Sequence, residues 1–182
     1  MSKAVLISIK PKWCEKIVNG NKTIEVRKTR PKLDTPFKCY IYCTLPKYPH
    51  EDFIATNYPR PQFYGGGKVI GEFTCDRIYE FEAKARGGSY YVKNEDQPTT
   101  NFIARQSCLD LKDMHDYLHA QKGYGWHITD LRIYDAPKCL FEFWAERLCR
   151  REPSVFGCGE CCDCDKRAPQ SWCYVQEVAC DE

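Results

Sequence analysis

Gly20-Asn21-Lys22-Thr23-Ile24-Glu25-Val26-Arg27 is the stretch in which a helical pattern changes into a strand pattern. Residues 11–18 place apolar side chains on one helical stripe, and glycine then suits the helix end because it adopts a left-handed backbone without a Cβ clash. From position 23 the period becomes two, so Ile24 and Val26 point to one face and the polar residues to the other. The stretch therefore predicts a helix followed by a strand with an apolar core face and a charged face.

The rest of the chain predicts mainly strands. Strand patterns cover residues 4–9, 37–45, 69–81 and 126–134, a helix starts near Ser107 and Asp110, and a Pro- and Tyr-rich loop fills residues 46–67. Residues 82–104 are polar and irregular, and residues 137–144 predict a short helix or turn. We expect an α+β fold, a barrel of about five or six mostly antiparallel strands with two or three helices.

Composition favours one globular domain over residues 1–182. Hydrophobic residues make up 43% of the chain, which argues against disorder. The longest apolar runs are far shorter than a bilayer span and the start lacks a signal-peptide pattern, so we expect a cytoplasmic protein with no membrane partner and with reduced cysteines. Gly65-Gly66-Gly67-Lys68 lacks the spacing of a phosphate-binding P-loop, so no nucleotide cofactor is expected.

Basic residues are concentrated near the start of the chain. Residues 1–40 hold ten Lys and Arg against three Asp and Glu, although the whole chain has a net charge of only +2. Such a bias is typical of proteins that bind polyanions, because Lys and Arg displace counterions from phosphates. Solvated strand and helix faces are the alternative explanation.

Lys22, Glu25 and Arg27 bring an ammonium, a carboxylate and a guanidinium to one side of the predicted strand. Arginine can hold a phosphate or a guanine edge with two hydrogen bonds, and glutamate can accept from an amino group such as that of cytosine. The residues therefore predict a polar cleft for a nucleic acid or nucleoside. An exposed, ion-paired strand face of little energetic value is the alternative.

Two tryptophans could add stacking surface to this cleft. Trp126 and Trp172 are candidates for stacking on a base, whereas packing in the core or at its rim is the alternative for both. His115 and His119 share a helix face, but Asp116 stands where a zinc protease motif has glutamate, so we expect them at the surface.

Six of the thirteen cysteines fall within the twenty-five residues that end at Cys173. Cys158 and Cys161 have the short spacing with which two thiolates hold one zinc ion, and Cys164 extends the pattern. We expect a structural Zn²⁺ in a Cys-rich insertion at residues 146–168. The fourth ligand is Cys149 in the favoured set, with Cys162 and Cys173 as alternatives, and a reduced Cys-rich loop is the alternative to any metal.

The helix followed by Gly20-x-Lys22-Thr23-x-Glu25-x-Arg27 resembles the signature of ASCH domains, a family of PUA-like β-barrels. Three further segments strengthen the likeness to ASCH proteins of phages and prophages: Gly71-Glu72-Phe73, Tyr124-Gly125-Trp126-His127-Ile128 and the closing segment from Pro169 to Val175, with Ser171 and Trp172. The resemblance implies a barrel whose motif lines a cleft, and RNA or a nucleoside-like molecule as partner.

The resemblance also implies a possible hydrolase, acting on an acylated nucleoside such as N4-acetylcytidine or on RNA. Amidohydrolases of this family carry a lysine where Lys22 stands and a nucleophilic threonine where Glu25 stands, so the nucleophile is missing here. In an enzyme, Lys22 would act as base or electrostatic activator, Glu25 would orient water, and Thr23 is a further candidate nucleophile. We therefore favour binding over hydrolysis, and a zinc-stabilised protein-interaction module is a third hypothesis.

Overall fold

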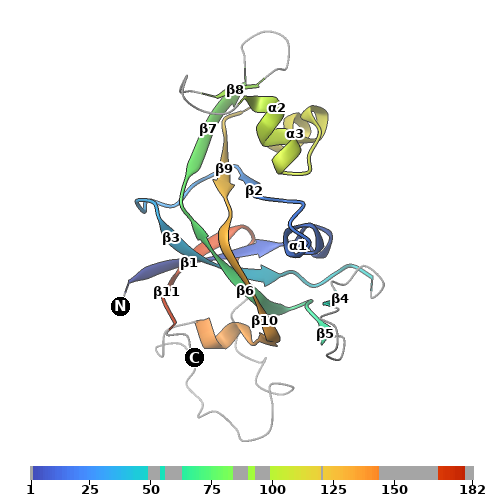
Figure 1. The fold of residues 1–182 in the computed structure, drawn as a ribbon, viewed down its shortest axis with the longest axis vertical. Coiled ribbons are helices and arrows are strands. Elements are labelled where there is room, and N and C mark those ends of the chain that lie inside the picture. Colours follow the sequence, from blue (N-terminus) through green and yellow to red (C-terminus); the bar gives the residue numbers. More distant parts are fainter. Residues whose placement is uncertain are drawn as a thin grey trace, which may run out of the picture. The chain divides into compact units, whose positions relative to one another are not determined.

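The computed structural model describes residues 2–48, 54–55, 63–83, 90–92, 99–119, 121–143 and 168–178. Strands and helices are mixed along these residues, which confirms the α+β class (Figure 1). The order is β1 (Lys3–Ile9), α1 (Pro11–Val18), β2 (Ile24–Arg27), β3 (Phe37–Cys43), β4 (Ile54–Ala55), β5 (Phe63–Tyr64), β6 (Lys68–Cys75), β7 (Ile78–Ala83), β8 (Tyr90–Val92), α2 (Thr100–Gln106), α3 (Leu111–Leu118), β9 (Gly123–His127), β10 (Thr129–Lys138), the 3-10 helix η2 (Leu140–Phe143) and β11 (Trp172–Gln176).

The chain forms two compact units, each with its own apolar core. The first unit comprises residues 1–15, 38–72 and 132–182, and the second comprises residues 16–37 and 73–131. The buried core of the first unit consists of Ala4, Leu6, Tyr40, Tyr42, Val69, Tyr134, Phe143 and Val175. The buried core of the second unit consists of Ile24, Val26, Tyr79, Phe81, Tyr90, Ile103, Ala104, Met114 and Leu118.

A five-stranded sheet in the order β10-β6-β3-β1-β11 contains the first unit's core strands. β1 is parallel to β3 and antiparallel to β11, and every residue of β1 after Lys3 is buried. Its apolar run, interrupted only by Ser8, therefore fits a strand with neighbours on both sides. Gly71 in β6 is required by close packing, since a Cβ there would lie 2.4 Å from the carbonyl oxygen of Arg132.

A four-stranded antiparallel sheet in the order β2-β9-β7-β8 organises the second unit, with α2 and α3 next to β8 (Figure 1). Thr99 caps α2 by accepting a hydrogen bond from Phe102 N–H, and Asp110 caps α3 by accepting one from Asp113 N–H. These caps satisfy amide groups that a helix start leaves without partners. They fix the two short helices that flank the candidate site.

Several predicted elements have different boundaries in the structure. The single strand predicted at residues 69–81 is two strands, β6 and β7, interrupted at Asp76 and Arg77, and the strand predicted at residues 126–134 is divided between β9 and β10. An alternating pattern shows which residues face the core, but it does not show where a strand changes its pairing partner. The prediction of continuous strands was therefore wrong.

The sequence patterns did not predict some strands and one helix. The segment taken as irregular at residues 82–104 contains β8 and most of α2, and the loop at 46–67 contains the short strands β4 and β5. Ser107 follows α2 as its C-cap, so of the two residues predicted at the helix start only Asp110 is an N-cap. The described residues form eleven strands, more than predicted, and their pairings do not include a single closed barrel.

One prediction falls on residues that the structure does not describe. The Cys-rich insertion at 146–168 falls almost entirely outside the described residues, as do Cys149, Cys158, Cys161, Cys162 and Cys164. Within the described part of the chain, no helix has the length and apolar character needed to cross a membrane.

Candidate functional site

The end of α1 delivers Lys22 to the interior of the second unit. Gly20 has a φ of +72°, and its N–H donates to the carbonyl of Ile17 over 2.9 Å. The N–H of Lys22 then donates to the carbonyl of Lys16 over 3.0 Å, so the turn is closed by backbone hydrogen bonds. Glycine is favoured here because an L side chain at this φ is strained. The sequence prediction of a helix stop at this position is confirmed.

Lys22 is buried and held by two partners. Its side chain donates to the carbonyl oxygen of Ser107 over 2.7 Å, and the same Nζ lies 3.2 Å from Oε2 of Glu25. Only 3% of Lys22 is exposed. A buried ammonium requires such partners, because removal from water is costly for an ion. Ser107 therefore contributes a backbone acceptor that no local pattern in the sequence indicated.

Glu25, a residue of β2, contacts two cationic side chains. Besides its contact with Lys22, its Oε1 is 3.0 Å from Nε of Arg27, and both side chains of this second pair are 8% exposed. The sequence predicted that these three residues share a face, and the structure brings them together. All four residues of β2 are buried, so the alternative of an exposed, ion-paired strand face does not hold. We refer to Lys22, Glu25 and Arg27 as the charged cluster.

Thr23 is fixed by α2 and by the chain that follows β9. Its N–H donates to the carbonyl of Gln106 over 2.9 Å, and its carbonyl accepts from the N–H of Ile128 over 2.9 Å. Its hydroxyl donates to the side-chain oxygen of Gln106. The structure thus gives Thr23 an anchoring role at the start of β2, with its hydroxyl directed to Gln106.

Trp126 lies directly opposite Glu25 in the antiparallel pair of β2 and β9. Opposed residues in such a pair point to the same face of the sheet. Trp126 is 0% exposed, and its ring meets that of Phe37 edge-on, with centroids 5.9 Å apart. This burial favours the packing explanation for Trp126 over base stacking.

Ser171 and Trp172 belong to the first unit. The carbonyl of Ser171 accepts a hydrogen bond from the N–H of Ser8 over 2.9 Å, and Trp172 pairs with Ile7 where β11 joins β1. Glu72 of the Gly71-Glu72-Phe73 segment is also in this unit, where it accepts a 2.8 Å hydrogen bond from the hydroxyl of Tyr134. The assignment of Ser171 and Trp172 as ligand-binding residues stays a prediction from the resemblance.

Tyr117 on α3 is a site residue that the sequence analysis missed. The side chain of Arg27 donates a hydrogen bond to its hydroxyl, and Nζ of Lys28 is 5.2 Å from the centroid of its ring. Burial is the main cause that raises the pKa of Tyr117, and Arg27 opposes the shift. Nevertheless 39% of Tyr117 is exposed, so it connects the buried charged cluster with the surface. Its contact with Arg27 is tertiary and leaves no sequence signature.

The described residues do not form a metal-binding site in addition to the charged cluster. Among them, no group of three or more His, Cys, Asp or Glu side chains could hold a metal ion. Cys173 is half-buried in β11, and burial raises its pKa to about 11.

The arrangement of strands and helices is that of solved ASCH-domain structures, so the chain has the ASCH-type fold. The similar structures are crystal structures of an ASCH protein from Zymomonas mobilis, in unmodified form and as a tyrosine-to-phenylalanine and a serine-to-alanine variant. The unmodified protein has a TM-score of 0.55 and 17% identity over 96% of this chain and 88% of that chain. The tyrosine variant has a TM-score of 0.56 and 17% identity over 97% and 92%.

Sequence comparison adds nothing to this structural likeness, since no protein-family model and no curated protein matches the chain. The prediction of an ASCH-type fold from the segment at residues 20–27 is confirmed. The phage or prophage type stays a prediction.

Proposed function

We propose that the chain binds RNA or a modified nucleoside at the charged cluster. The observation that carries this proposal is the burial of two cations with one carboxylate, each less than 10% exposed. A buried ion pair is often no better for stability than well-packed apolar residues, so stability alone gives little reason to retain one. The charged cluster has two cations and one carboxylate, and this excess of one positive charge favours an anionic ligand.

Tyr117 and Lys28 provide the surface through which a ligand would meet the cluster. The exposed part of the Tyr117 ring offers a stacking face, and Arg27 holds its hydroxyl from the interior. A base stacked on an aromatic side chain typically gains about 1 to 3 kcal/mol. The lysine ammonium beside the same ring would lie close to the phosphate of a stacked nucleotide.

The chain beyond β2 continues this basic surface. Lys28, Arg30 and Lys32 are all exposed, and no acidic residue stands between them in the sequence. Contacts of Lys and Arg with phosphates supply most of the sequence-independent affinity for nucleic acids. The basic bias seen near the start of the chain is thereby concentrated next to the charged cluster.

The test is RNA binding measured at several salt concentrations. A short single-stranded RNA is expected to bind more weakly as salt rises, and each phosphate contact removed should reduce the slope of log K against log salt by about 0.7. Lys28→Ala/Arg30→Ala is expected to lower both affinity and slope, whereas Lys10→Ala, an exposed lysine of the first unit, should change neither. Equal affinity and slope in the double variant and the wild type would overturn the proposal.

Hydrolysis of an acylated nucleoside or of RNA is the second candidate. The 3.2 Å contact of Lys22 with Glu25 favours it, because a buried ammonium and carboxylate can exchange a proton. Incubation with N4-acetylcytidine and with RNA, followed by mass spectrometry, tests this activity. Turnover that is lost in Glu25→Gln but kept in Lys10→Ala would support it, and the absence of product with the wild type would exclude these two substrates.

A further inference from the structure

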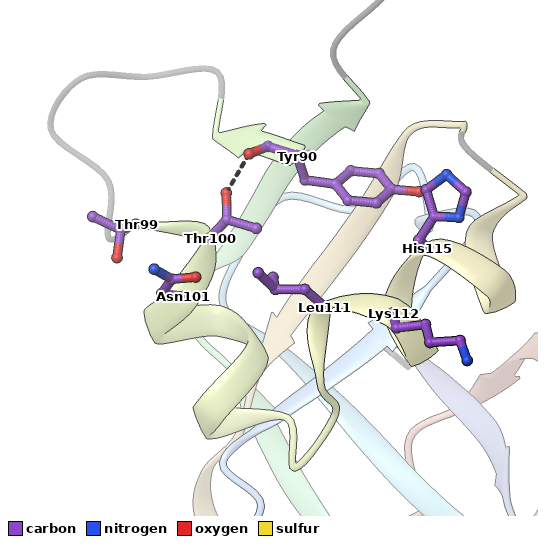
Figure 2. A pocket seen from close by; sticks show the side chains of 7 residues that line it. All are labelled: Tyr90, Thr99, Thr100, Asn101, Leu111, Lys112 and His115. Carbon is purple, nitrogen blue, oxygen red and sulfur yellow. Dashed lines mark hydrogen bonds between the residues drawn. The ribbon is translucent and has the colours of Figure 1, made fainter. Parts of the chain in front are cut away.

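A hollow of about 620 Å³ opens between β8, α2 and α3 in the second unit (Figure 2). This volume is within the range of roughly 300 to 1,000 Å³ that is usual for small-molecule sites. Neither Lys22, Glu25 nor Arg27 lines it, so it is separate from the charged cluster. Its lining residues are Tyr90, Thr99, Thr100, Asn101, Leu111, Lys112 and His115.

Tyr90 and Leu111 give the hollow an apolar floor. The Tyr90 ring is held edge-on by Phe81 at 5.8 Å and by His115 at 6.3 Å between centroids. Leu111 is 46% exposed, although Met114 and Leu118 further along the same helix are buried. Figure 2 shows Leu111, the first residue of α3, between Asn101 of α2 and Lys112. A flat apolar molecule would cover this leucine and contact a ring whose position is already fixed.

The two threonines keep the shape of the hollow. The hydroxyl of Thr100 donates to the carbonyl oxygen of Tyr90 over 2.9 Å, which joins α2 to β8 (Figure 2). Thr99 accepts from the N–H of Phe102 over 3.3 Å as the helix cap. Both hydroxyls are therefore occupied by the fold, and the recognition of a ligand falls to other side chains.

Asn101 and Lys112 are exposed on opposite sides of the hollow. Among the described residues, neither side chain has a hydrogen-bond or ion-pair partner, so an amide and an ammonium are available to a ligand. His115 lies beside Lys112 on α3 (Figure 2), and its Nδ1 is 3.6 Å from the carboxylate of Asp116. The hollow thus has a hydrogen-bonding end, an apolar floor and a cationic end.

We propose that this hollow binds a nucleoside monophosphate. The base would lie over Leu111 and the edge of Tyr90, the phosphate would meet Lys112 and His115, and the Asn101 amide would pair with a base edge, which it matches by offering both a donor and an acceptor. The ligand is either a free mononucleotide or one nucleotide of an RNA strand. The site works without the charged cluster and does not rest on its proposed function.

Calorimetric titration with the four ribonucleoside 5′-monophosphates and with the corresponding nucleosides tests this site. At least one monophosphate is expected to bind, and Lys112→Ala should weaken that binding about tenfold, because a hydrogen bond to a charged group contributes about 1.5 to 3 kcal/mol. Nucleoside binding should change less than about twofold, since only the phosphate contact is lost. The matched control is Lys16→Ala, an exposed helical lysine of the same unit, which should bind as the wild type does.

A second variant separates ligand contact from folding. Asn101→Trp fills the hollow from an exposed helix position and is expected to abolish monophosphate binding, while circular dichroism shows unchanged helix content. The absence of monophosphate binding to the wild type, with no effect of Lys112→Ala on RNA binding, would overturn the proposal. Equal affinities of the wild type and Lys112→Ala for every ligand would overturn it as well.

Two further comparisons identify the source of the ligand. A Lys112→Ala effect on free monophosphates indicates a mononucleotide site, whereas an effect confined to an RNA oligonucleotide indicates one nucleotide of a strand. Lys28→Ala/Arg30→Ala should leave monophosphate binding unchanged. Loss of RNA binding in that double variant, with monophosphate binding intact, would therefore separate the hollow from the proposed function of the charged cluster.

Discussion

At the scale of single residues, the burial of the charged cluster determines how much its ion pairs matter for stability, which its composition alone does not. An exposed ion pair contributes about 0 to 1 kcal/mol, whereas removing one partner of a buried pair leaves an uncompensated ion in the interior. Lys22, Glu25 and Arg27 are all in the second situation. Alanine variants of these residues therefore report on folding before they report on binding.

Lys22→Ala is expected to lower the free energy of unfolding by about 3 to 5 kcal/mol, because Glu25 and the carbonyl of Ser107 both lose the ammonium. Urea unfolding followed by circular dichroism measures the change. Lys16→Ala, which removes an exposed lysine, should stay within about 0.5 kcal/mol of the wild type. A loss below about 1 kcal/mol in Lys22→Ala would show that solvent screens the pair.

Tyr117 offers a cleaner measurement of ligand contact, since much of its side chain is exposed. Tyr117→Ala is expected to weaken binding of single-stranded RNA by about 1 to 3 kcal/mol through loss of the stacking face. Tyr117→Phe keeps the ring and removes only the hydroxyl bonded to Arg27, so it should retain most of the affinity. If both variants bind as the wild type does, Tyr117 is not the stacking residue.

At the scale of elements, β2 is short, and its neighbours determine its position. β9 pairs with its whole length from Ile24 to Arg27, and Gln106 at the end of α2 binds the backbone of Thr23. α3 serves two surfaces at once, because Tyr117 reaches Arg27 while Lys112 and His115 line the hollow. The four-residue strand could not hold the buried Glu25 and Arg27, with Lys22 just before it, without these supports.

For the Cys-rich segment at residues 146–168, which lies almost entirely outside the described residues, we propose a structural zinc ion. The favoured ligands are Cys158, Cys161 and Cys164 with Cys149, and Cys162 and Cys173 are the alternatives for the fourth ligand. Elemental analysis of protein purified without chelators is expected to give about one zinc per chain, since four thiolates complete a tetrahedral site.

Cys158→Ser/Cys161→Ser should abolish this zinc content. The matched control is Cys108→Ser, a half-buried cysteine whose Sγ donates to the carbonyl of Asn21 over 3.2 Å, a bond that serine can replace. Metal-free wild-type protein, or equal zinc in the double variant, would leave a reduced loop as the explanation. In that case the third hypothesis, a zinc-stabilised interaction module, also fails.

At the scale of the whole molecule, buried thiols couple stability to pH. Burial is the first cause that raises the pKa of Cys75 from 9.0 to about 12, and this residue is 0% exposed. A group whose pKa is raised on folding keeps its full contribution below the unfolded value and loses it as pH rises toward the folded value. The contribution of Cys75 is therefore complete below pH 9 and declines between pH 9 and about 12.

The expected outcome is a free energy of unfolding that falls with pH above 9, with Cys75 contributing up to about 1.4 kcal/mol per pH unit. Urea unfolding under reducing conditions at pH 8, 9 and 10 measures it. Cys75→Ala should show a shallower decline, and the remaining slope includes Cys173, Tyr40 and Tyr117, whose pKa values are also raised. An identical slope in wild type and variant would contradict this assignment.

Local sequence determined the secondary structure around the decisive segment and, through the ASCH resemblance, the fold. The change of period after Gly20 fixed the end of α1 and the start of β2, because backbone preference and side-chain alternation act between near neighbours. It also placed Lys22, Glu25 and Arg27 in one group. What the pattern could not give was the boundary between β6 and β7, or the helix α2 within a polar segment, because pairing partners and tertiary packing decide them.

Only the tertiary structure decided what surrounds the charged cluster. The two-residue alternation of a strand shows which side chains share a face. Whether that face is exposed to solvent depends on residues far away in the sequence. Ser107 accepts from Lys22 across 85 positions, and Tyr117 on α3 receives the hydrogen bond of Arg27. These long-range contacts make the charged cluster a buried ionic centre, and its energy depends on the groups packed around each charge.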